Sequence, residues 1–249
     1  LFGVALGTVT LPLLSRLAVT GNRPAFRGEL ARGMRLAFLM TIPCTVGLMM
    51  LAEPIVSLLY QHGRFDAYQT AEAAGALRYY AIGLAGYAAL KVLVTAFYAL
   101  DHRRTPMYVS FFAVALNLLL NWIFTRHFGW GHRGLAFSTG CVATCNFLVL
   151  YALMHRHLQR LEGRRMATLL VKVALASAAL AVVCWGSQQW LLQDWARMAF
   201  AARTGWLLLT IVTGIGVFLW CGALLRIEEL RELGQALRRR AHRTPGQGR

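Results

Sequence analysis

Acidic residues are scarce in this chain: Asp and Glu number 10 among 249 residues, and only 14% of all residues are charged. Soluble globular domains carry about 25% charged residues. The low charged fraction therefore argues against a soluble globular domain. The mean hydropathy of +0.51 agrees with that exclusion.

Lysine is almost absent, so the net charge of +16 comes from arginine. A strongly basic chain is often a nucleic-acid binder. Here the arginines stand between apolar runs rather than on one polar face, and no nucleic-acid-binding signature occurs. The sequence therefore predicts no nucleic-acid partner, and it favours arginines that hold loops on one side of a membrane.

Motifs of enzymes and metal sites are also missing. The chain has no P-loop, HExxH or GxSxG motif, and its five cysteines form no CxxC pair. Cys141 and Cys145 share a helix face, but no His or carboxylate on their segment joins them as a ligand. We therefore predict that the protein is not an enzyme and carries no tightly bound cofactor.

Long apolar runs dominate what is present. We count seven, and several are long enough to cross the roughly 30 Å hydrocarbon layer of a bilayer. They are continuously apolar rather than alternating, which disfavours a β-barrel. The fold class predicted is all-α, a polytopic transmembrane helix bundle of about seven spans. The runs cover residues 1–14, 36–59, 77–100, 107–125, 134–154, 166–187 and 204–225.

The first run is too short to span a bilayer, and the chain opens inside it without an initiator Met. We therefore expect a fragment of a longer protein, with the first span truncated. Residues 1–225 would form the transmembrane unit. Residues 226–249 would form a basic tail, with an amphipathic helix over 226–242 lying on the inner leaflet. The alternative for the tail is a frayed charged segment.

Arginine is unevenly divided between alternate connections. Segments 15–35, 101–106 and 155–165, together with the tail from 226, hold 18 of the 24 arginines. Segments 60–78, 126–133 and 188–203 hold the other six. By the positive-inside rule the first set is cytoplasmic, which predicts a multi-pass membrane protein with a cytoplasmic C-terminus.

Lys91 is the one ionisable residue predicted to lie at mid-depth of a complete span. Such residues are costly in a bilayer and face a partner or a water-filled cavity. Two interpretations stay open: a cation that lines a cavity and attracts an anionic head group, or a salt bridge to a carboxylate on another span. Lys172 lies near the arginine-rich end of its span, where its side chain would reach the interface.

Amides and hydroxyls form a second polar group inside the predicted membrane region. Asn117 and Asn121 are four residues apart and share a helix face, while Ser138 and Thr139 lie on the next span. They would either hydrogen-bond neighbouring helices or help to ligate a cation. Prolines 12, 43 and 54, with glycine pairs such as Gly83 and Gly86, are expected to break or kink helices.

Several short motifs, taken in order, resemble the middle and C-terminal part of the MurJ (MviN) lipid II flippases. The order and spacing agree across essentially the whole chain. The matching residues are Gly3-Val4-Ala5-Leu6-Gly7-Thr8, Leu11-Pro12-Leu13-Leu14-Ser15-Arg16, Tyr60-Gln61-His62-Gly63-Arg64-Phe65, Lys91-Val92-Leu93, Ala96-Phe97-Tyr98-Ala99, Arg104-Thr105-Pro106 and Gly134-Leu135-Ala136.

The resemblance implies one lobe of a two-lobed transporter of the multidrug/oligosaccharidyl-lipid/polysaccharide exporter superfamily. It implies alternating access in the bacterial inner membrane, with undecaprenyl-linked peptidoglycan precursor (lipid II) as substrate. The partners implied are that precursor, membrane lipids and an N-terminal lobe, which in the family holds the main arginines that bind the diphosphate. The alternatives are a drug or cation antiporter of the same superfamily and a non-transporting membrane module.

The resemblance also implies where sites would lie. Lys91 would bind substrate from one side of the cavity. Asn117, Asn121 and Thr139 fall where some members of the family are thought to bind a sodium ion, although these spans supply no carboxylate. The last two spans would form a groove for the lipid tail, with a face of small residues at Ala174, Ala178 and Ala181.

Overall fold

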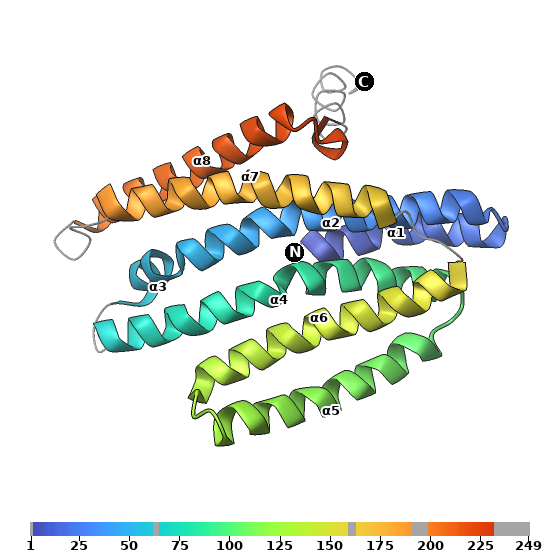
Figure 1. The fold of residues 1–249 in the computed structure, drawn as a ribbon, viewed down its shortest axis with the longest axis horizontal. Coiled ribbons are helices and arrows are strands. Elements are labelled where there is room, and N and C mark those ends of the chain that lie inside the picture. Colours follow the sequence, from blue (N-terminus) through green and yellow to red (C-terminus); the bar gives the residue numbers. More distant parts are fainter. Residues whose placement is uncertain (1, 62–64, 159–162, 191–198, 232–249) are drawn as a thin grey trace, which may run out of the picture.

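The computed structural model describes residues 2–61, 65–158, 163–190 and 199–231, and every regular element in these ranges is an α-helix (Figure 1). The prediction of an all-α bundle is confirmed. The helices are α1 (Phe2–Val19), α2 (Arg23–Met50), α3 (Ala52–Tyr60), α4 (Ala67–Ala99), α5 (Arg104–Arg126), α6 (Gly131–Leu158), α7 (Gly163–Trp190) and α8 (Phe200–Leu224).

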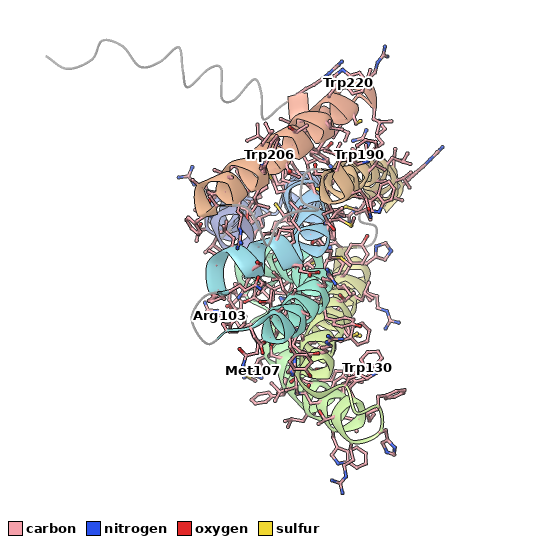
Figure 2. The ribbon with its side chains drawn as sticks, turned by 90° about the vertical axis from the view of Figure 1, so that its left-hand side faces the viewer. Arg103, Met107, Trp130, Trp190, Trp206 and Trp220 are labelled. Atoms are coloured by element: carbon pink, nitrogen blue, oxygen red, sulfur yellow. The ribbon has the colours of Figure 1, made fainter. Side chains whose placement is uncertain are left out.

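The long helices lie side by side in one row, in the order α8, α7, α2, α4, α6, α5 (Figure 1). Helix α1 packs beside α2 and α4, so α4 is the central helix, in contact with α1, α2, α3 and α6. Figure 2 views this row end on as a tall, narrow stack, with Trp206 of α8 toward one end and Trp130 toward the other.

Within the described ranges, six helices are long and apolar enough to cross a membrane, namely α2, α4, α5, α6, α7 and α8. Helix α1 adds a shorter apolar stretch, Gly7–Val19. These match the seven apolar runs, including the short first one. The helices extend beyond the runs because polar residues continue them. A capping box starts α4 ten residues before its apolar run: Gln69 N–H donates to Asp66 Oδ1 at 2.8 Å, and Asp66 N–H donates to Gln69 Oε1 at 3.3 Å.

The expectation that prolines break the helices was wrong for two of the three. Pro12 lies inside α1 and Pro43 inside α2, and both helices continue through them, as membrane helices commonly do. The break falls instead at Leu51, between α2 and α3, and Pro54 then occupies the first turn of α3. Gln188 of α7 donates a hydrogen bond to the Met50 carbonyl at this break.

The helix ends alternate between the two ends of the bundle. In Figure 1 the C-terminal ends of α1, α4, α6 and α8 lie toward the right, and those of α3, α5 and α7 lie on the left. The described parts of the arginine-rich segments therefore share one end, as the charge distribution predicts. We call it the arginine-rich end.

Three helices finish at the arginine-rich end with the same C-terminal motif. Gly21, Asp101 and Arg226 follow α1, α4 and α8 with positive φ angles of 66°, 58° and 49°. After α4, His102 N–H donates to Phe97 O at 2.9 Å and Asp101 N–H donates to Tyr98 O at 3.1 Å. This Schellman pattern satisfies carbonyls that the helix itself leaves unpaired, and it turns the chain sharply at the interface.

The first residues of the tail pack against the bundle. Ile227 is buried, and Glu229 accepts a hydrogen bond from Arg35 Nε of α2 at 2.7 Å, with only 15% and 11% of the Arg35 and Glu229 side chains exposed. Lys172 Nζ donates to the Arg226 carbonyl at 3.3 Å, which places that lysine at the arginine-rich end. The tail beyond Arg231, including most of the predicted amphipathic helix, lies outside the described residues.

Candidate substrate-binding face and apolar groove

Lys91 is the only charged residue in the sequence between Arg78 and Asp101. Its side chain is half-buried, and Nζ lies 4.9 Å from the centroid of the Tyr87 ring. A cation over an aromatic face is held by the ring quadrupole. Among the residues that the structure describes, no carboxylate pairs with Lys91. Within the described residues, the salt bridge that the sequence left open does not form.

Lys91 lies in line with three exposed tyrosines along α4. Tyr87, Lys91 and Tyr98 follow Tyr80 by 7, 11 and 18 residues, so all four point within about 20° of one direction on a helix with 3.6 residues per turn. The three tyrosines are 51%, 50% and 50% exposed in chain order. We call this set, Tyr80, Tyr87, Lys91 and Tyr98, the open face of α4.

Small residues on the flanks bring the neighbouring helices close to α4. A Cβ atom added to Gly83 would lie 2.5 Å from the Gly140 Cα of α6. On the other flank, a Cβ added to Gly3 of α1 would lie 2.9 Å from the Ala88 Cα. Gly83 was expected to break α4, but the helix is continuous there, and this glycine is a packing site.

The predicted cation ligands of α5 form a hydrogen-bonded chain. Asn121 Nδ2 donates to Asn117 Oδ1 at 2.9 Å, and the Ser138 hydroxyl of α6 donates to Asn121 Oδ1. Thr139 instead is exposed and donates to the Leu135 carbonyl of its own helix at 2.8 Å. The structure thus brings Ser138, rather than its neighbour Thr139, to the asparagines.

This arrangement fits a helix contact better than a cation site. Both amide oxygens already accept a hydrogen bond, and no charged ligand lies in the chain of contacts. No group of three or more His, Cys, Asp or Glu residues that could hold a metal ion occurs within the described ranges. Hard cations prefer carboxylate oxygens, so the sodium site at Asn117, Asn121 and Thr139 stays a prediction.

An apolar groove of about 460 Å³ lies between α2, α3, α7 and α8. Its single hydroxyl, on Thr210, donates to the Trp206 carbonyl at 2.9 Å, so no free polar group of that residue faces the groove. Leu230 of the tail also lines it. The lining residues are Leu39, Met40, Pro43, Cys44, Gly47, Leu48, Leu51, Ile55, Leu180, Cys184, Thr210, Ile211, Gly214, Ile215, Phe218, Leu219 and Leu230.

The small-residue face expected on α7 does not line this groove, and the lipid-tail groove of the last two spans stays a prediction. Ala174 and Ala178 are exposed and do not line it, whereas Leu180 and Cys184 do. Residues of α2 also line the groove. The apolar composition of the spans could not predict that α2 packs beside α7 and α8. The lining of the groove is almost entirely apolar, so burying apolar groups there would be favourable.

Ion pairs tie the opposite end of the bundle together, and the sequence did not reveal them. Glu72 of α4 accepts from Arg133 Nη2 at 2.8 Å and lies 2.7 Å from His132 Nε2, both at the start of α6. Glu53 of α3 lies 3.5 Å from Arg78. All of them except Glu53 lie in segments 60–78 and 126–133, which the arginine distribution had already assigned to the same side of the membrane. That shared side was the signal in the sequence that these residues could meet.

Six helices of the described residues are long and apolar enough to cross a membrane, which makes this chain a polytopic α-helical membrane protein. The sequence profile of the family described as "Lipid II flippase MurJ" matches residues 1–204. The chain therefore belongs to the MurJ lipid II flippase family, a family of transporters.

Individual relatives agree with this assignment. A probable lipid II flippase MurJ of Vibrio cholerae is 31% identical over 238 residues, which cover 93% of this chain and 44% of the relative. The lipid II flippase MurJ of Burkholderia cenocepacia is 36% identical over 151 residues, covering 61% of this chain and 29% of the relative. The chain thus spans less than half the length of these relatives.

A solved structure shares the fold. The chain of a lipid II flippase MurJ in an inward closed conformation superposes with a TM-score of 0.68 at 23% sequence identity. The match covers 90% of this chain and 43% of the solved one. The arrangement of helices is therefore that of one half of a known transporter structure.

Proposed function

We propose that this chain forms one lobe of a lipid II flippase of the bacterial inner membrane, with the arginine-rich end in the cytoplasm. The observation that carries the proposal is Lys91 on the open face of α4, at mid-depth and without a carboxylate partner among the described residues. The printed names of the relatives and the share of their length that this chain covers support it.

The physical problem of flipping explains the two surfaces. The diphosphate of the substrate cannot enter hydrocarbon unpaired, because burying an isolated charge costs many kcal/mol. Lys91 offers a cation at the depth where that cost is greatest, and Tyr87 holds its ammonium group within 4.9 Å of the ring centroid. The head group would cross along the open face of α4 while the lipid tail stays in an apolar environment.

The apolar groove supplies that environment. Its lining comes from α2, α3, α7 and α8, whereas Lys91 is on α4. The tail and the head group of one amphipathic molecule would therefore contact different parts of the lobe. Movement between inward-open and outward-open states would carry the head group past Lys91 without removing the tail from lipid-like surroundings.

Complementation tests this function. The complete product of the gene is expressed in cells depleted of their own lipid II flippase, as wild type, Lys91→Ala, Lys91→Arg and Lys172→Gln. Lys172, at the arginine-rich end, is the matched control because it is the other lysine of this sequence. We expect rescue by the wild type and by Lys172→Gln, loss of rescue with Lys91→Ala, and at least partial rescue with Lys91→Arg, which keeps the charge.

Two results would contradict the proposal. Failure of a well-expressed wild-type protein would mean that the protein moves a different substrate. Full rescue by Lys91→Ala would remove the lysine from the mechanism. Membrane levels of each variant are measured in parallel, so that loss of folding is separated from loss of flipping.

A further inference from the structure

The tyrosines of the open face extend across the whole membrane. Tyr80 and Tyr98 are 18 residues apart, which corresponds to about 27 Å along a helix with a rise of 1.5 Å per residue. The hydrocarbon layer of a bilayer is about 30 Å thick. One face of one helix therefore presents an aromatic ring near each interface and a third ring, Tyr87, between them.

Anchoring in the interface explains the outer two tyrosines but not Tyr87. Tyr and Trp are enriched where membrane meets water, because the ring is apolar and the hydroxyl is polar. Tyr87 lies 9 residues after Arg78 and 14 before Asp101, about 14 Å and 21 Å from the charged ends of the span. It is 50% exposed on the same face as the Lys91 ammonium group. Such a face meets water or a polar ligand rather than lipid.

Exposed tyrosine rings in a hydrated channel are suited to sugars. The two faces of a pyranose ring carry axial C–H groups, which stack on the electron-rich face of an aromatic ring, while the sugar hydroxyls remain solvated. Tyrosine adds a phenolic hydroxyl that donates and accepts hydrogen bonds. A ligand that must move needs several contacts of moderate strength rather than one deep site.

We propose that Tyr80, Tyr87 and Tyr98 form a stacking platform for the sugar rings of the lipid-linked head group. This inference rests on the proposed function and names the part of the substrate that the open face recognises. Lys91 neutralises the diphosphate, and the tyrosines on either side of it hold the saccharide in successive positions across the membrane.

Binding of two lipids that differ only in the head group tests the platform. The complete gene product, purified in detergent, is titrated with undecaprenyl diphosphate and with undecaprenyl diphosphate that carries the disaccharide-pentapeptide. The variants are the single Leu substitutions Tyr80→Leu, Tyr87→Leu and Tyr98→Leu, together with Tyr87→Phe. Tyr68→Leu is the control, because Tyr68 is exposed on the same helix but lies about 120° around it from Tyr80.

We expect Tyr80→Leu and Tyr98→Leu to weaken binding of the sugar-bearing lipid by about three- to tenfold, with no change for the sugar-free lipid. Tyr87→Leu also removes the ring beside the Lys91 ammonium group, so it should weaken both lipids, and the sugar-bearing lipid more. Tyr87→Phe keeps the ring and should bind both lipids like the wild type. Tyr68→Leu should also leave both affinities unchanged. Lys91→Gln, in contrast, should weaken both lipids, because both carry the diphosphate.

The outcomes separate the platform from the proposed function. If the wild type binds both lipids but the three Leu variants bind the sugar-bearing lipid normally, the platform is overturned and the flippase function stands. Equal losses for both lipids in Tyr80→Leu and Tyr98→Leu would also overturn it, since they would mean that these tyrosines only shape the cavity. If the wild type binds neither lipid, the proposed function fails first.

Discussion

The crossing of α4 and α6 should be intolerant of a single methyl group. Gly83 and Gly140 meet there, and a Cβ atom on Gly83 would lie 2.5 Å from the Gly140 Cα and 3.1 Å from its carbonyl oxygen. Non-bonded carbon atoms prefer a separation of about 3.5–4.0 Å. Gly83→Ala must therefore push the two backbones about 1 Å apart at the crossing.

The cost follows from the contacts that this separation loosens. Gaps of 0.5–1 Å forfeit roughly a quarter to a half of each dispersion contact, and overpacking in well-packed interiors costs about 1–3 kcal/mol. Alanine gains about 1 kcal/mol over glycine in helix propensity. Gly216→Ala in α8 provides the same gain without the clash, because nothing lies within 4 Å of its added Cβ.

The comparison to make is the free energy of unfolding of the two variants in mixed micelles, followed by circular dichroism during a denaturing-detergent titration. We expect Gly83→Ala to be about 1–3 kcal/mol less stable than Gly216→Ala, because the propensity gain is common to both. Equal stabilities would refute the close α4–α6 contact, and with it the placement of the open face between α1 and α6.

Three further predictions concern the ends of the bundle and the groove. Glu229→Ala should destabilise the protein by about 1–3 kcal/mol, since the Arg35 pair is mostly buried; reversing both charges (R35E with E229R) should restore most of the loss in thermal unfolding, and no recovery would argue against the pair. Gly214→Phe should fill the apolar groove and reduce flipping at normal membrane levels; undiminished flipping would remove the groove from the mechanism. Arg156→Cys should resist an impermeant thiol reagent in intact spheroplasts while Tyr68→Cys reacts, and the reverse pattern would invert the topology.

Much of the fold follows from composition along the chain. Apolar runs of sufficient length have no alternative to helices in a bilayer, because every backbone group must be satisfied within the segment. The alternation of arginine-rich and arginine-poor connections then predicts which connections lie on the same side of the membrane. Helix ends were less predictable, since residues such as Asp66 and Gln69 continue a helix beyond its apolar run by capping it.

Contacts between helices needed the structure. The sequence placed Asn117 and Asn121 on one face, but it could not give the rotation of α6 that selects Ser138 over the adjacent Thr139. Lys91 was identifiable because a charge at mid-depth is conspicuous. The pair formed by Arg35 and Glu229 joins residues 194 apart, and no local pattern marks such a contact.

The central claim is that the open face of α4 lies in water at mid-membrane depth. Tyr87→Cys tests it, in the complete gene product with all native cysteines replaced by serine, by the rate of labelling with a charged, water-soluble maleimide in membrane vesicles of both orientations. Leu175→Cys on α7 is the control, because Leu175 is 58% exposed on a face that should meet lipid. The account predicts rapid labelling of Tyr87→Cys and none of Leu175→Cys; an unreactive Tyr87→Cys would contradict it.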